Sequence, residues 1–149
     1  MVYSRRNRTF VVKSRLGDER IGVETAIVAK ILVVDDEPNN RLLLATILEY
    51  AGHEIVEAKD GADAMRRARY GVPDLVVMDL HMPGMSGAEF LQALRAEPGF
   101  ERVKVALYTA TMTNPDLQQF MDANGVKHVI GKPSEPREVI EVVKSILGD

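Results

Sequence analysis

Short apolar runs alternate with amphipathic segments from residue 30 onward. The runs are almost continuously apolar, which is typical of strands buried on both faces of a parallel sheet. The segments between them repeat apolar residues at helical spacing, as at Leu44, Ile47, Leu48 and Ala51. The pattern predicts strands over residues 30–34, 54–58, 75–78, 103–108 and 127–130.

Capping and stop residues mark where the intervening helices begin and end. Pro38 suits a first helical turn, where its missing N–H costs little, and Gly52 ends that helix. Asp60 and Ser86 can each accept N–H groups at the start of a helix. Helices are therefore expected over 38–51, 61–70, 87–96, 115–124 and 135–147.

Five strand–helix units in succession predict an α/β fold, (βα)₅. Parallel strands joined by right-handed crossovers form a doubly wound five-stranded sheet with helices on both faces. We expect the strand order 2-1-3-4-5, which is that of flavodoxin-like folds. In this order the first and third strands are neighbours, and the crevice between their carboxyl ends is the usual place for a ligand site.

Polar residues follow four of the predicted strands. Asp35 and Asp36 come after the first strand and Asp79 after the third, so the three acids should meet in one crevice. Thr109 ends the fourth strand, and Lys132 follows the fifth. Three acids, a hydroxyl and a lysine together form a site that can bind a divalent metal and receive a phosphoryl group.

The chemistry of such a cluster favours a bound cation. Three neighbouring carboxylates repel one another, and one of them would stay protonated unless a cation neutralised the group. Mg²⁺ suits an all-oxygen site of this kind. A carboxylate such as Asp79 can act as a nucleophile towards phosphorus, and Lys132 can offset the charge that develops during transfer.

Composition narrows the possible functions. The chain of 149 residues is one domain with some length to spare, and no cysteine is present for disulfides, thiolate catalysis or Cys-based metal sites. No apolar run approaches the roughly 20 residues of a membrane helix. The net charge of −3 does not suggest nucleic-acid binding. Residues 1–29 contain six basic and three acidic groups, so a basic segment precedes an acidic domain.

The motifs resemble those of the receiver domains of bacterial two-component response regulators. Each motif alone is weak, but four in this order are specific when Asp79 follows Asp36 by 43 residues, Thr109 follows Asp79 by 30 and Lys132 follows Thr109 by 23. The resemblance extends over residues 29–149. The matching segments are Asp35-Asp36-Glu37-Pro38, Asp79 with Met82-Pro83-Gly84-Met85-Ser86-Gly87, Thr109-Ala110 and Lys132-Pro133.

The resemblance implies a phosphoacceptor role for Asp79. The donor would be the phosphohistidine of a histidine kinase or histidine phosphotransferase, and the product an aspartyl phosphate. Asp35, Asp36, Asp79 and the backbone carbonyl of His81 would bind Mg²⁺. The domain would be a signalling module that promotes its own phosphorylation and dephosphorylation, rather than an enzyme acting on other substrates.

Further residues have roles by the same resemblance. Thr109 would contact the phosphoryl oxygens, and Lys132 would pair first with the acids and then with the phosphoryl group. His81 and Thr111 would flank that group, and we expect both to modulate its lifetime.

Val129 departs from the family pattern. Many receivers have Tyr or Phe at this position, whose ring moves inward after phosphorylation, and a valine has no ring to move. Strand alternation also points Tyr108 and His128 away from the side of Thr109 and Val129. Output would then use backbone shifts at the fourth helix, the fifth strand and the fifth helix, or the domain would pass its phosphoryl group onward.

The resemblance to receiver domains also gives expectations for the two ends of the chain. Residues 1–28 are expected to be a flexible basic extension, a start assigned too far upstream, or a basic docking arm; residues 9–12 could form an edge strand. Only two residues follow Leu147, so we expect a single-domain regulator, although a receiver excised from a hybrid kinase would look the same. Such a regulator would be cytoplasmic, a monomer or weak dimer, and would act on a downstream protein.

Three other functions compete with this one. A flavodoxin-like cofactor binder needs neutral donors after the first strand, whereas Asp35-Asp36-Glu37 repels a phosphate. A degenerate receiver would be a phosphorylation-independent protein-binding module, yet all five expected polar residues are present. An acid-nucleophile phosphatase would need a second acid two residues after Asp79, where His81 stands.

Overall fold

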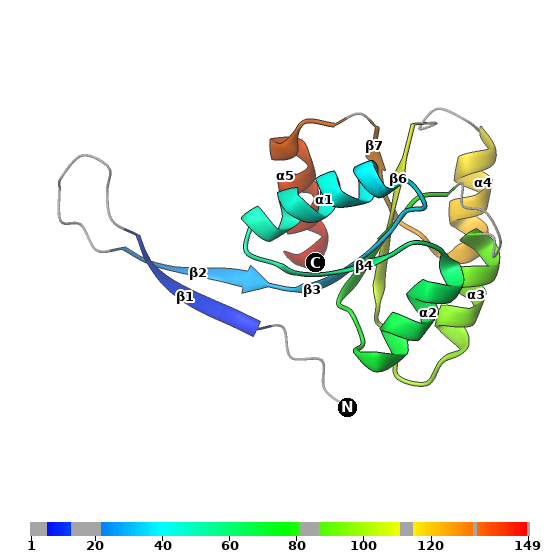
Figure 1. Cartoon of the computed structure of the whole chain (residues 1–149), viewed down its shortest axis with the longest axis horizontal. Coiled ribbons are helices and arrows are strands. Elements are labelled where there is room, and N and C mark those ends of the chain that lie inside the picture. The colour runs from blue at the N-terminus through cyan, green and yellow to red at the C-terminus, as the bar shows by residue number, and fades with distance from the viewer. Residues whose placement is uncertain (1–5, 13–21, 81–86, 111–114, 133, 149) are drawn as a thin grey trace.

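The computed structural model describes residues 6–12, 22–80, 87–110, 115–132 and 134–148, and the side chains from residue 28 onward. The described strands form two separate sheets, one of five strands and one of two (Figure 1).

The five-stranded sheet is parallel and has the predicted order. Its central strand β5 lies between β3 and β6, and the outer strands β4 and β7 complete the order β4-β3-β5-β6-β7. This is the order 2-1-3-4-5 when the strands of this sheet are counted along the chain, so the predicted fold class is confirmed. The strands are β3 (Lys30–Val34), β4 (Glu54–Ala58), β5 (Leu75–Met78), β6 (Lys104–Thr109) and β7 (His128–Gly131).

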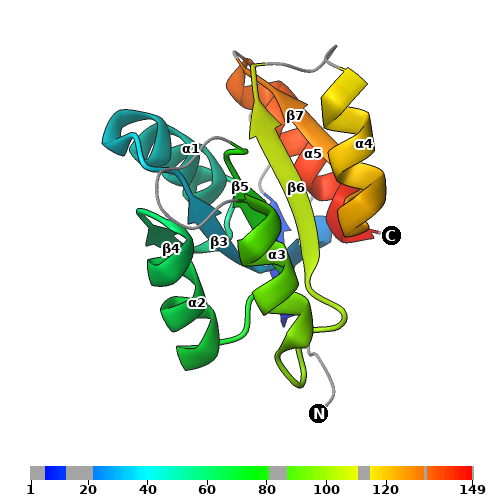
Figure 2. The ribbon, with the colours of Figure 1, turned by 90° about the vertical axis from the view of Figure 1, so that its right-hand side faces the viewer.

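Five helices cover the two faces of this sheet. In Figure 1, α1 and α5 lie to the left of β6 and β7, and α2, α3 and α4 lie to the right; Figure 2 shows α3 in front of the sheet. A core cluster on the first side includes Leu44 of α1 and Val143 of α5. A core cluster on the other side includes Phe90 of α3 and Leu117 of α4. The helices are α1 (Pro38–Tyr50), α2 (Gly61–Tyr70), α3 (Gly87–Ala96), α4 (Pro115–Asn124) and α5 (Pro136–Gly148).

Local chemistry explains the helix boundaries. Pro38 lies in the first turn of α1, and Glu37 caps that helix by accepting the Asn39 N–H at 3.1 Å. Asp60 caps α2 by accepting the Asp63 N–H at 2.7 Å. Gly52 follows α1 with a φ of 96°, in the left-handed region that favours glycine. The predicted cap Ser86 lies outside the described residues.

The N-terminal segment contains structure that the sequence reasoning did not predict. Strand β1 (Arg6–Val12) pairs antiparallel with β2 (Gly22–Val28), and these strands form the separate two-stranded sheet. The possible edge strand at 9–12 falls within β1. Both core clusters consist of residues from Ala29 onward. Whether the extension moves relative to the rest of the domain stays a prediction.

Candidate functional site

Three carboxylates meet at the carboxyl end of the central strands. Val34 and Met78 are partners in the β3–β5 ladder, so the residues that follow them are neighbours. The Asp79 N–H donates to the Val34 carbonyl at 3.0 Å, which extends the ladder into the site. One carboxylate oxygen from each of Asp35, Asp36 and Asp79 lies within 4.8 Å of the other two. The predicted acidic cluster therefore forms.

The three acids differ in exposure. Asp35 is only 2% exposed, and its Oδ1 accepts the Glu37 N–H at 2.9 Å. The Asp35 N–H donates to the carbonyl of Ala58 in β4 at 3.1 Å, so this residue is held on both sides. Asp79 is half-buried, whereas Asp36 is exposed. The cluster thus has a fixed inner acid and a side open to solvent.

Lys132 joins two of the acids. Its Nζ donates to Asp35 Oδ2 at 3.2 Å and to Asp79 Oδ2 at 3.0 Å. Burial by itself lowers the pKa of Lys132, but the hydrogen bond to Asp79 and the charges of Asp35 and Asp79 outweigh it, so the pKa is raised above its ordinary value. Lys132 is therefore a cation throughout the neutral pH range.

Thr109 holds the backbone of the lysine. It is the last residue of β6, is 1% exposed, and its carbonyl accepts the Lys132 N–H at 2.9 Å. Its neighbour in β7 is Gly131, the residue before Lys132. The ends of β6 and β7 thus bring Thr109 and Lys132 to the edge of the sheet where the acids lie.

Of the residues predicted to modulate the site, the structure describes only Val129. His81 and Thr111 lie outside the described residues, so their roles stay predictions. Val129 packs against the core cluster on the α3 side of the sheet, whereas Tyr108 belongs to the cluster on the α1 side. The predicted separation of these two side chains is confirmed.

Two residues near the acids, Arg41 and Tyr108, were not predicted from the sequence to take part in the site. Arg41 Nη1 donates to the Asp35 carbonyl at 2.7 Å, and Arg41 Nε pairs with Glu57 of β4 at 3.3 Å. The Lys132 Nζ lies 4.8 Å from the centre of the Tyr108 ring. The position of Arg41 in the first turn of α1 could have indicated its contact, because that turn begins beside Asp35.

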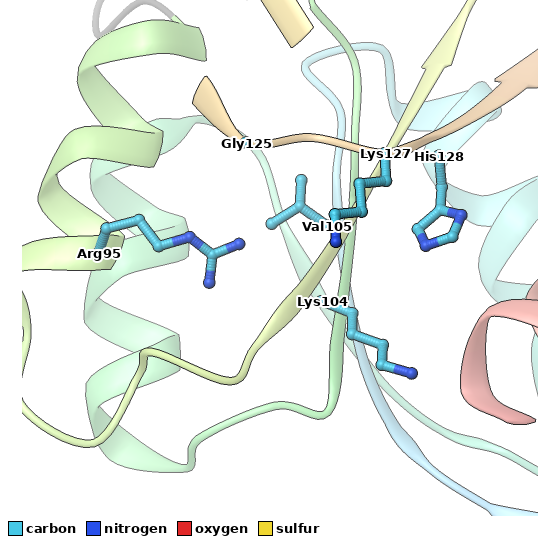
Figure 3. A pocket seen from close by; sticks show the side chains of 6 residues that line it. All are labelled: Arg95, Lys104, Val105, Gly125, Lys127 and His128. Atoms are coloured by element: carbon cyan, nitrogen blue, oxygen red, sulfur yellow. The ribbon is translucent and has the colours of Figure 1, made fainter. Parts of the chain in front are cut away.

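A basic pocket lies at the opposite edge of the sheet, where β6 and β7 begin (Figure 3). Lys104 points towards α5, and its Nζ donates to the carbonyl of Ile146 in the last turn of that helix at 2.7 Å. Arg95 Nη1 donates to the Val103 carbonyl at 2.7 Å. A cation at a helix C-terminus is favoured by the helix dipole. We therefore assign Lys104 and Arg95 structural roles, separate from the acidic cluster.

The comparisons with known proteins decide the family. The model of the response regulator receiver domain matches residues 31–144. The chain belongs to this family. It is 30% identical to the polar-differentiation response regulator DivK of Brucella anthropi over 119 residues, which is 80% of this chain and 96% of DivK.

Solved receiver structures agree with the fold. The chemotaxis response regulator CheY4 of Vibrio cholerae has a TM-score of 0.74 and 29% identity, with 80% of this chain and 98% of CheY4 covered. The receiver domain of a sensor histidine kinase from Pseudomonas aeruginosa has a TM-score of 0.74 and 24% identity, with 82% and 99% covered; its structure has a magnesium ion coordinated in the active site cleft.

Membership of the family sets the general function. Receiver domains are signalling modules of two-component systems, and they interact with histidine kinases or phosphotransfer proteins. In the part of the chain that the structure describes, no helix combines the length and apolar character needed to cross a membrane.

Proposed function

We propose that this receiver accepts a phosphoryl group on Asp79 from the phosphohistidine of a histidine kinase or histidine phosphotransferase. The observation that supports this most is the setting of the Asp79 carboxylate. It lies at the carboxyl end of β5, within hydrogen-bond distance of Lys132 and beside two further acids. The alternative of a phosphorylation-independent binding module does not need this arrangement.

A divalent cation fits the acidic cluster. Asp35, Asp36 and Asp79 offer oxygen ligands only, which suits Mg²⁺ better than a softer metal. One ammonium, that of Lys132, does not balance three carboxylates, so a further cation is favoured there. Asp35, Asp36, Asp79 and the carbonyl of His81 would hold Mg²⁺. When bound, Mg²⁺ would offset the negative charge on the phosphoryl oxygens.

Each residue then has a defined part in the transfer. A carboxylate oxygen of Asp79 attacks phosphorus, a P–O bond forms, and the P–N bond to the donor histidine breaks with its electron pair leaving on the imidazole nitrogen. Lys132, whose Nζ donates to Asp79 Oδ2 at 3.0 Å, offsets the charge on the transferred oxygens. The Thr109 hydroxyl donates to one of these oxygens. His81 and Thr111, by flanking the phosphoryl group, would set how fast water reaches it.

The phosphoryl group on Asp79 would either change how the domain binds a downstream protein or pass onward in a relay. Family membership supports both, and the domain would act as a monomer or weak dimer without direct contact to nucleic acid. As a regulator of this kind it would be cytoplasmic. Val129 favours an output that does not depend on an aromatic side chain at that position.

Acetyl phosphate with Mg²⁺, followed by intact mass measurement, tests the proposal. One added HPO₃ is expected with Mg²⁺ and none with EDTA. Asp79→Asn should take up none, while Asp122→Asn, a matched change on the exposed surface of α4, should be phosphorylated like the parent. A folded parent that takes up no HPO₃ from acetyl phosphate or a histidine phosphodonor would contradict the proposal and favour the binding module.

A further inference from the structure

An aromatic ring contacts the lysine of the site from an unexpected side of the sheet. Tyr108 precedes Thr109 in β6 and is 8% exposed. The Lys132 Nζ lies 4.8 Å from the centre of its ring, within the range of a cation–π attraction. The same ammonium donates to Asp35 and Asp79. Lys132 is therefore held by two carboxylates and one aromatic ring.

The ring belongs to the core on the α1 and α5 side. Tyr108 is a partner of Ile130 in the β6–β7 ladder, and both are members of the cluster that includes Val139 of α5 and Leu44 of α1. Val129, at the position where many receivers have an aromatic residue, lies on the opposite face. The aromatic contact to the site thus leads towards α1 and α5, and away from α3 and α4.

The ring differs from the carboxylates in one respect. The attraction of Lys132 to Asp79 depends on the charge of that carboxylate, and in an aspartyl phosphate the negative charge would lie on the phosphoryl oxygens instead. The attraction to the Tyr108 ring comes from its π-electrons and is independent of that change. The ring can therefore hold the Lys132 ammonium near the site both before and after phosphorylation of Asp79. If the ammonium shifts, the position of the ring shifts with it.

The charges of the acidic site also act on the hydroxyl of Tyr108. Burial raises the pKa of its hydroxyl, the charge of Lys132 acts to lower it, and the charge of Asp35 acts to raise it. Tyr108 is therefore electrostatically linked to two residues of the acidic site although it is packed in the core.

We propose that Tyr108 is a positioning residue for Lys132, and that through its ring the α1 and α5 face of the sheet senses the state of Asp79. This inference rests on the proposed phosphoryl transfer to Asp79 for its second part only. The contact itself exists in the resting domain and can be tested without phosphorylation.

The first test uses fluorine NMR of the full chain with fluorotyrosine in place of tyrosine. Loss of one signal in Tyr108→Phe identifies the Tyr108 resonance. Lys132→Met should shift that resonance, whereas Lys127→Met, a matched change at the opposite edge of the sheet, should not. An unchanged Tyr108 resonance in Lys132→Met would overturn the contact.

Phosphoryl loading with acetyl phosphate and Mg²⁺ is then followed on the same signals. The Tyr108 resonance should move, while that of Tyr70, which is 96% exposed on α2, should stay in place as an internal control. A mass increase of one HPO₃ without movement of Tyr108 would overturn the sensing role. If no HPO₃ is taken up, the proposed function fails, and the Lys132→Met result still decides the contact.

The rate of phosphorylation supplies the second test. Tyr108→Leu, which keeps an apolar side chain but removes the π-electrons, should slow the reaction by about 3- to 10-fold. Tyr108→Phe should recover most of that loss, and Ile130→Val, which trims the same core, should show no comparable loss. Equal losses in Tyr108→Leu and Tyr108→Phe, or none in either, would contradict a positioning role. Should Tyr108→Leu fail to fold, Tyr108→Met takes its place.

Discussion

Repulsion among three neighbouring carboxylates is the main feature of this domain at the scale of single residues. Asp35 is buried and receives hydrogen bonds from Glu37 and Lys132, whereas Asp36 is exposed. Three like charges this close together are expected to lower the stability of the domain when no cation is bound. Functional sites often contain such strained arrangements, and removing the function can stabilise the fold.

Asp36→Asn should stabilise the metal-free domain. Removal of one like charge from the cluster is expected to raise the free energy of unfolding by about 0.5–1 kcal/mol, because the site is partly open to solvent. Mg²⁺ at about 100 times its Kd should stabilise the parent by about 2.7 kcal/mol and the variant by much less. Urea denaturation with Mg²⁺ or EDTA measures both effects. A variant less stable than the parent in EDTA would contradict this.

Arg41 should tune metal affinity through the backbone of Asp35. Arg41→Leu removes the hydrogen bond to the Asp35 carbonyl, and we expect Mg²⁺ affinity to fall about 10-fold, as for other residues that orient ligands. Glu57→Gln is the matched control, because it removes the ion pair at Arg41 Nε and leaves that hydrogen bond. Calorimetric titration with Mg²⁺ measures the affinities. Equal losses in both variants would show that the ion pair, and not the hydrogen bond to Asp35, is responsible.

At the scale of elements, a histidine in the turn between α1 and β4 is hydrogen-bonded to the residue that precedes β3. The His53 imidazole, between α1 and β4, accepts the Ala29 N–H at Nδ1 at 3.2 Å. Burial lowers the pKa of His53 below its ordinary value of 6.5. The folded domain therefore favours the neutral imidazole, whose Nδ1 is free to accept.

The sign of this shift predicts a loss of stability in acid. Because the folded pKa is depressed, the unfolded chain takes up the proton first, and the contribution of His53 is present above about pH 6.5 and lost as the pH falls through the folded pKa. The expected loss does not exceed that of one hydrogen bond, about 1 kcal/mol. Denaturation of the parent and of His53→Gln at pH 8 and pH 5 isolates it. A parent as sensitive to this pH change as His53→Gln would refute the assignment.

Most elements could be predicted from the sequence because their signals are local. The strands 30–34, 54–58 and 75–78 were predicted with the observed bounds, since each is a short apolar run between turn residues. The expected bounds of the last two strands, the first helix and the last helix differ by one residue from those observed, which is common because the ends of such elements are poorly defined. The hairpin of β1 and β2 was missed because its strands are separated by the nine residues 13–21, too many for the two-residue turns that mark short hairpins.

Some residues of the candidate site could likewise be predicted from the sequence, and one could not. Asp35, Asp79, Thr109 and Lys132 could be predicted because each lies at the carboxyl end of a strand, and parallel strands end at the same edge. Tyr108 could not be, because alternation places it on the opposite face and only the path of the Lys132 side chain brings the two together.

At the scale of the whole molecule, the hairpin of β1 and β2 lies outside the matched receiver sequence and outside both core clusters. Both core clusters lie between Ala29 and Leu147, and the family model matches residues 31–144. The sheet of β1 and β2 is separate from the five-stranded sheet. Folding of the domain should therefore depend little on residues 1–27.

Deletion of residues 1–27 should leave the receiver folded and active. We expect the Tm to change by less than about 5 °C, because the deletion takes no residue from either core cluster. The rate of phosphorylation by acetyl phosphate should stay within about twofold of the parent. Calorimetry and intact mass measure these quantities. An unfolded product would contradict the independence of the domain, and a steep, salt-dependent loss of partner affinity would support the basic docking arm.

Identification of the phosphorylated residue tests the central claim most directly. The chain is treated with acetyl phosphate and Mg²⁺, then with borohydride, which reduces an aspartyl phosphate to homoserine, and its peptides are sequenced by mass spectrometry. The account predicts homoserine at position 79 alone, and none when EDTA replaces Mg²⁺. Homoserine at position 35 or 36, or a phosphorylated chain with none at position 79, would contradict it.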